Sequence, residues 1–229
     1  MKFLSLIKWD IKAQIGYGLY YVYLGVTAVY ALILLNLPLR IRGEAGAVTI
    51  LSDPSILGFY MIGGLVLFER DSRFLSALFT TPLPFRSYII SKITSLTAVS
   101  LAAAVILAVP AGLRISGLPW LITGVILTSV LFLMIGFTAV SLTSTLNWYL
   151  ISSGAYMAVF AAPPLLFYFN VLDHYLWNLL PTRASLILIR GGFFPVTAAE
   201  GAAGIISLLL WIAGCYPVMR LCYLRRMRG

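Results

Sequence analysis

Long runs of apolar residues dominate the sequence, and short polar stretches separate them. A membrane-spanning helix needs about 20 mostly apolar residues. Six runs approach or exceed that length: Leu19–Leu37, Pro54–Phe68, Tyr88–Leu113, Leu118–Leu142, Tyr149–Phe169 and Thr197–Met219. Pro54–Phe68 is near the lower limit of length. The pattern therefore predicts an all-α polytopic membrane protein with six spans, forming one transmembrane domain over residues 1–229.

The N-terminal segment, residues 1–16, is too polar to insert but has helical periodicity. Its apolar face carries Leu4, Ile7, Ile11 and Ile15, while Ser5, Lys8 and Lys12 line a neighbouring face. Asp10 and Gln14 interrupt the apolar face. This pattern predicts an interfacial helix with its lysines toward anionic head groups. The alternative is an ordinary charged flank of the first span.

The composition excludes most soluble classes. Apolar residues make up 61% of the chain and charged residues 10%, whereas soluble domains have about 45–50% and about 25%. The two cysteines, Cys215 and Cys222, are seven residues apart on one helix. At about 1.5 Å of rise per residue they are too far apart for a disulfide bond. A disordered chain and a disulfide scaffold are therefore excluded as well.

The positions of the basic residues predict the topology. Eleven belong to the N-terminal segment, the connection after the second span and the C-terminus: Lys2, Lys8, Lys12, Arg70, Arg73, Arg86, Lys92, Arg220, Arg225, Arg226 and Arg228. Five lie on the other side: Arg40, Arg42, Arg114, Arg183 and Arg190. The positive-inside rule then places both termini in the cytoplasm, in a multi-pass plasma-membrane protein. Topology thus explains the net charge of +9, and no nucleic-acid partner is expected.

The connection from Glu69 to Lys92 is the most structured loop and reads ERDSRFLSALFTTPLPFRSYIISK. Asp71 or Ser72 is suited to cap a short helix with an apolar face, and Pro82 and Pro84 end it. Such a helix either docks into a groove on a partner protein or rests on the inner leaflet. The residues alone do not decide between the two. The other inner connection, Thr143–Trp148, is short and uncharged.

The outer connection from Asn170 to Thr197 is too apolar for a solvated loop. Two short re-entrant or interfacial helices satisfy its backbone best. We expect Thr182 to cap the second of them and Gly191 to end it. Arg183 and Arg190 then lie at head-group level.

Chemical motifs are scarce. The sequence contains no GxxxxGK[ST] nucleotide loop, a single histidine (His174) and no acid at a span centre. Ser153–Gly154 lacks the base that an intramembrane serine protease requires. Autonomous ATP use, ion-coupled transport, a metal site and catalysis are therefore not expected.

At this point the residues resemble the permease subunit of type 2 ABC exporters. Members of that family show a Glu at the end of the second span, a short helix, a Thr-Pro-Leu turn and a Lys entering the third span. Here these are Glu69, Thr81-Pro82-Leu83 and Lys92. Arg73-Phe74 stands where the family often has Gly-Thr. The stretches SLIKWDIKAQIGYGLYYVYL and LLPTRASLILIRGGF are similar to a fluoroquinolone or drug export subgroup.

The resemblance implies a coupling helix that contacts a separate ATP-hydrolysing subunit. The implied contact residues are Glu69, Arg70, Asp71, Arg73, Phe74, Leu75, Leu78 and Phe79. It also implies pairing with a second permease copy or a paralogue. No cofactor is expected on this chain, because ATP and Mg would bind the partner ATPase subunit.

The resemblance places the translocation path along the second and fifth spans of both copies. Pro163–Pro164 predicts a kink there, either for packing or to line the path. The predicted path residues are Phe59, Tyr60, Phe160, Pro163, Pro164 and Phe167. They suit a hydrophobic or amphipathic solute, drug-like or lipid-like. The alternatives are a non-transporting assembly or scaffold protein and, less favoured, a lipid-modifying enzyme.

Overall fold

A computed structural model of the chain describes residues 3–52, 56–71, 85–160, 166 and 179–227. All regular secondary structure in these ranges is helical. The helices are α1 (Phe3–Gly16), α2 (Leu19–Asn36), α3 (Leu39–Ile50), α4 (Leu57–Asp71), α6 (Phe85–Ala111), the short 3-10 helix η2 (Ile115–Gly117), α7 (Leu118–Leu142), α8 (Leu146–Phe160), α10 (Pro181–Arg190) and α11 (Ala198–Met227). The predicted all-α class is confirmed for the described residues.

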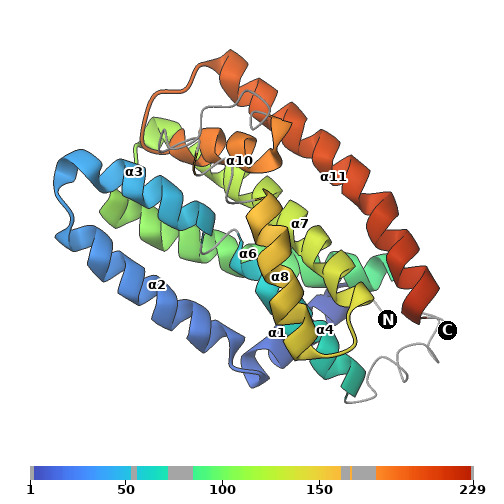
Figure 1. Cartoon of the computed structure of the whole chain (residues 1–229). Helices are drawn as coiled ribbons and strands as arrows, with labels where there is room; N and C mark the ends of the chain where they lie inside the picture. Colours follow the sequence, from blue (N-terminus) through green and yellow to red (C-terminus); the bar gives the residue numbers. More distant parts are fainter. Residues whose placement is uncertain (1–2, 53–55, 72–84, 161–165, 167–178, 228–229) are drawn as a thin grey trace.

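Helix α7 is the centre of the bundle (Figure 1). It contacts α4, α6, α8, α10 and α11. Its 25 residues include no charge, and its buried side chains lie on several faces rather than along one stripe. A helix that is apolar all round is buried on all sides, and neighbours on several sides of α7 satisfy that requirement.

Four helical segments in the described part of the chain are long and apolar enough to cross a membrane. They are Leu19–Asn36, Arg86–Ala111, Ile115–Leu142 and Ala198–Tyr223. These correspond to the first, third, fourth and sixth predicted spans. The second and fifth predicted spans correspond to α4 and α8, each with 15 described residues. The count of six spans therefore stays a prediction.

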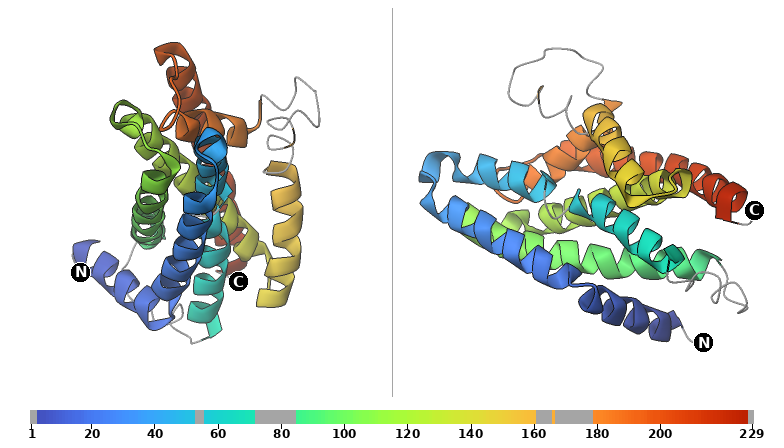
Figure 2. Two further views of the ribbon diagram at one scale, coloured as in Figure 1. Left: turned by 90° about the vertical axis from the view of Figure 1, so that its left-hand side faces the viewer. Right: turned by 60° about the horizontal axis from the view of Figure 1, so that its bottom comes forward.

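Helix α3 was not predicted, because its sequence LRIRGEAGAVTI mixes charges and small residues within the expected outer connection. Pro38 precedes it, and Gly46, Ala47 and Ile50 are buried. Figures 1 and 2 show that α3 and α4 follow one another, returning the chain from the far end of α2 to the end where α1 lies. This return thus begins upstream of the predicted run Pro54–Phe68.

Both chain ends lie at the same end of the bundle (Figure 1). The end of α4 is held there by Arg70, whose guanidinium donates to the carbonyls of Thr143 and Ser144 at 3.3 and 3.0 Å. These two residues belong to the predicted uncharged turn, which is confirmed because α7 ends at Leu142 and α8 begins at Leu146. The predicted side of the membrane for this end stays a prediction.

Helix α10 confirms a short helix in the outer connection, packed against α3, α7 and α11. Gly191 follows its last residue, as predicted. The prediction that Thr182 caps it was wrong, because Leu180 precedes the helix and Pro181 takes its first position. The hydroxyl of Thr182 instead donates to the carbonyl of Phe160. The first predicted outer helix lies outside the described residues.

Candidate functional site

A buried cluster of charges joins three helices at the end of the bundle where the chain begins. Lys92 of α6 places its Nζ 2.9 Å from Asp10 Oδ1 of α1 and 2.5 Å from Glu69 Oε1 of α4. The side chains of Lys92, Asp10 and Glu69 are only 1%, 8% and 4% exposed. We call these three residues the ion cluster.

Neighbouring residues of α6 satisfy the remaining oxygens of the ion cluster. The hydroxyl of Tyr88 donates to Glu69 Oε2 at 2.6 Å. The hydroxyl of Ser91 donates to Asp10 Oδ2. The ammonium of Lys92 also lies 4.8 Å from the centroid of the Tyr88 ring, a cation–π geometry. Buried charges persist only when they are paired and hydrogen-bonded, and each carboxylate here has both an ion pair and a hydroxyl donor.

The polar contacts extend along α1 and α6 beyond the charges. Gln14 Nε2 donates to Ser95 Oγ at 2.7 Å, and the Ser95 hydroxyl is also placed to donate to the carbonyl of Lys92 at 3.1 Å. Tyr88, Ser91 and Ser95 share one face of α6, because residues three and four apart are neighbours on a helix. That polar face receives α1.

Helix α1 docks into the bundle through its polar residues, and its predicted position in the membrane interface stays a prediction. The side chains that α1 buries are Leu6, Asp10 and Gln14, four residues apart, whereas Ile15 of the predicted apolar face is 45% exposed. The two polar residues that interrupted the apolar pattern therefore mark the face that docks into the bundle. The four-residue spacing of Asp10 and Gln14 was the sequence signal for this buried face. The polar residues of α6 that they contact explain why polar side chains are buried there.

The ion cluster lies at the two ends of the segment that is predicted to couple to an ATPase. That segment connects α4 to α6, and Glu69 and Lys92 lie near its two ends. Their ion pair holds these helix ends together, and Asp10 adds α1 to the same unit. Sequence reasoning assigned Glu69 to the partner contact and Lys92 to the entry of the third span, but it did not predict that Asp10 pairs with Lys92.

The other predicted coupling residues fall in different places. Arg70 is exposed and bonded to the turn between α7 and α8. Asp71 is the last residue of α4. Arg73, Phe74, Leu75, Leu78 and Phe79 lie outside the described residues. Their predicted contact with a partner therefore stays a prediction.

The predicted path residues that the structure describes lie in two different environments. Phe59 is fully buried, stacks on Tyr149 at a centroid distance of 5.6 Å and meets Tyr60 edge-on, so the chain's own residues enclose its ring. Phe160 lines an open cavity of about 900 Å³ between α7, α8 and α11. Pro163, Pro164 and Phe167 lie outside the described residues.

Comparison with known proteins identifies the family. The sequence profile of the Fluoroquinolones export permease protein family matches residues 1–227. Two relatives from Mycobacterium tuberculosis, strains CDC 1551 and H37Rv, are each called a fluoroquinolones export permease protein. Each is 33% identical over 178 residues, which cover 77% of this chain and 74% of the relative. With a match over almost its whole length, this chain belongs to the fluoroquinolones export permease protein family.

Proposed function

We propose that this permease is the membrane-spanning subunit of an ATP-driven exporter of the ABC class. ATP hydrolysis takes place on separate subunits, with Mg and ATP bound there. The chain works with a second permease copy or a paralogue in the plasma membrane, with both termini in the cytoplasm. The solute is hydrophobic or amphipathic and drug-like, in keeping with the names of the relatives.

The ion cluster is the observation that carries this proposal. A sequence without a nucleotide loop or an acid at a span centre must receive its energy through a protein contact. The sequence of the segment between α4 and α6 predicts a short helix with an apolar face and flanking charges. The Glu69–Lys92 pair couples both ends of that segment to the bundle, and Asp10 extends the coupling to α1. A displacement of the segment by a partner would therefore move α1, α4 and α6 together.

The test replaces the apolar face of the segment with charges. In the variant Phe74→Asp, Leu78→Asp, Phe79→Asp, carboxylates would face the apolar groove of the ATPase, which costs several kcal/mol when they are buried unpaired (~2–7 kcal/mol for even a neutral polar group). We expect the variant to insert normally, because the spans are unchanged, but to lose co-purification with the ATPase subunit and solute-stimulated ATP hydrolysis.

The matched control places three aspartates at polar positions of the same segment, in the variant Ser72→Asp, Ser76→Asp, Thr80→Asp. It adds the same charge without removing an apolar contact, so it should retain most of the co-purification. Wild-type recovery and wild-type coupling in the apolar-face variant would show that the contact lies elsewhere, with α1 as the next candidate. An insertion-competent chain that recruits no ATPase at all would favour the scaffold alternative.

A further inference from the structure

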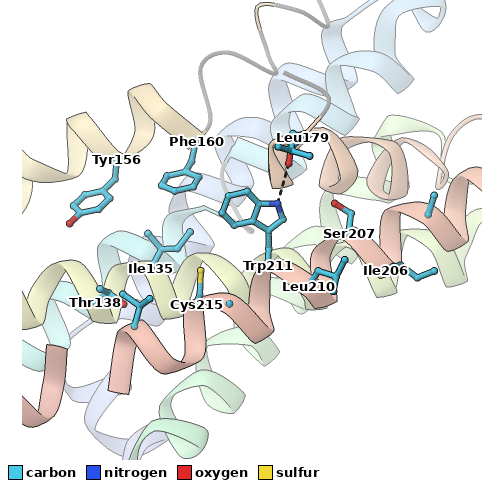
Figure 3. Close-up of a pocket in the computed structure, with 13 residues that line it drawn as sticks. Ile135, Thr138, Tyr156, Phe160, Leu179, Ile206, Ser207, Leu210, Trp211 and Cys215 are labelled. Carbon is cyan, nitrogen blue, oxygen red and sulfur yellow. Dashed lines mark hydrogen bonds between the residues drawn. The ribbon is translucent and has the colours of Figure 1, made fainter. Parts of the chain in front are cut away.

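The cavity between α7, α8 and α11 borders the predicted fifth span, whose path residue Phe160 lines it, but among its described lining residues none belongs to α4, the predicted second span. Ile135 of α7 lies at its floor, Tyr156 and Phe160 of α8 form one wall, and Ile206 and Trp211 of α11 form the other (Figure 3). We call it the lateral cavity. Its volume of about 900 Å³ falls within the range of about 300–1,000 Å³ that is typical of sites for drug-sized ligands.

Three aromatic side chains shape the lateral cavity. Tyr156 and Phe160 are one helical turn apart and project from α8 toward α11 (Figure 3). Phe160 meets Trp211 edge-on at a centroid distance of 5.9 Å and an interplanar angle of 88°. The indole Nε1 of Trp211 donates to the carbonyl of Leu179 at 3.1 Å. The polar edge of the indole is therefore satisfied, and its orientation is fixed.

The lining contains no charged residue among the described part of the chain. Its polar groups are hydroxyls and a thiol, those of Thr138, Tyr156, Ser207 and Cys215. The Thr138 hydroxyl already donates to the carbonyl of Met134 at 2.9 Å, so it can only accept from a ligand. A charged group would find no counter-charge among the described lining residues, and burying a charge unpaired is unfavourable.

The lateral cavity opens along two candidate membrane spans. Its floor belongs to Ile115–Leu142 and one of its walls to Ala198–Tyr223. On α11, Ile206 and Leu210 are 58% and 68% exposed. In the proposed membrane-spanning arrangement these exposed apolar side chains would face lipid, which would let a solute dissolved in the bilayer reach the cavity laterally.

We propose that the lateral cavity binds an uncharged, drug-sized aromatic solute that enters from the bilayer. This rests on the proposed export function and names the class of solute. Aromatic rings attract one another in edge-to-face and offset arrangements beyond simple apolar burial. The fixed Trp211 and the two rings of α8 therefore favour a planar aromatic molecule over a saturated lipid chain. The hydroxyls orient it without requiring a charge.

Two probes that differ in charge test the proposal. The neutral 1-pyrenebutanol and the anionic 1-pyrenebutyrate share one ring system and accept energy from excited tryptophan. Each is titrated into the purified permease in phosphatidylcholine vesicles, without ATPase. The signal of Trp211 is the difference between the wild-type protein and Trp211→Phe. We expect saturable transfer to 1-pyrenebutanol and about tenfold or more weaker binding of the butyrate, because the described lining residues offer no counter-charge.

A matched pair of glycine variants locates the binding. Gly214 lines the cavity, and a Cβ built there meets no atom within 4 Å, so Gly214→Phe fills the space without a clash at that atom. Gly25 is equally open and belongs to α2, which lies on the other side of the bundle from α11 (Figure 1), so Gly25→Phe is the control. We expect Gly214→Phe to weaken 1-pyrenebutanol binding about tenfold and Gly25→Phe to leave it unchanged, as expected when a pocket loses its volume.

Three results would overturn the proposal. Transfer that never saturates would show that lipid chains fill the cavity. Equal affinity for both probes would contradict the uncharged class, and this comparison needs no variant. Equal binding by folded Gly214→Phe and Gly25→Phe would place the probe elsewhere. Because no ATPase is present, these outcomes are independent of the co-purification test of the export function.

Discussion

Replacing Lys92 with Met removes the only cation of the ion cluster while keeping the length and apolar stem of the side chain. Asp10 and Glu69 then remain buried without their ion pair, although the hydroxyls of Ser91 and Tyr88 still donate to them. Breaking a buried ion pair by removing one partner costs about 3–5 kcal/mol, because the other charge is left uncompensated. Here one substitution removes two buried ion pairs, so we expect the upper part of that range.

The measurement is thermal unfolding of the purified permease in detergent, followed by intrinsic fluorescence. For a chain of about this length, 1 kcal/mol shifts the Tm by about 2–4 °C. A loss of about 3–5 kcal/mol therefore lowers the Tm by about 6–20 °C. The matched control is Lys12→Met. Lys12 lies on the exposed side of α1, so this substitution removes the same charge from the surface.

A triple variant separates lost pairing from lost packing. Asp10→Asn, Glu69→Gln, Lys92→Met removes all three charges of the ion cluster, and the amide oxygens can still accept from the hydroxyls of Ser91 and Tyr88. We expect the triple variant to recover most of the Tm that Lys92→Met loses. A Lys92→Met protein whose Tm stays within about 2 °C of Lys12→Met would refute the reasoning, because one uncompensated charge alone should exceed that shift.

Two further predictions follow from packing and topology. Gly63→Ala would place its Cβ 2.0 Å from a buried tyrosine ring, whereas a Cβ at Gly64 meets nothing within 4 Å. Gly63→Ala should therefore lower the free energy of unfolding by about 1–3 kcal/mol in thermal unfolding. Gly64→Ala should raise it by up to about 1 kcal/mol. Equal effects of the two substitutions would contradict the packing. A cysteine at Gly43 should react with an impermeant outside reagent and one at Ser76 should not, since basic residues mark the inner side; outer labelling at Ser76 would overturn the topology.

The sequence predicted the long helices well, because the thickness of a bilayer sets their length and composition. α2, α6, α7 and α11 all coincide with predicted apolar runs. Helix α1 was also predicted, since its periodicity is local. The turn between α7 and α8 followed from a short, uncharged stretch between two apolar runs. In each case, the deciding information lies within about 20 neighbouring residues.

The ion cluster could not be predicted from neighbouring residues in the sequence. Asp10 and Lys92 are 82 positions apart, and their pairing depends on how α1 docks against α6. On its own, Asp10 reads as a charge in a flank, and Lys92 as a basic residue at the entry of a span. Helix α3 was missed for a related reason. Its small residues carry little apolar signal, yet they fit because Ala111 of α6 approaches Gly46 closely.

The ion cluster also limits which motions can carry energy from the cytoplasmic segment into the bundle. A displacement that separates α4 from α6 must break the buried ion pair between Glu69 and Lys92. That separation costs about 3–5 kcal/mol before any other contact is lost. A displacement that moves α1, α4 and α6 together keeps all three charges paired. Because the second motion avoids this cost, the proposed ATPase contact drives the three helices as one body against α7, and Lys92→Met should weaken the coupling of ATP hydrolysis to solute even where the ATPase still binds.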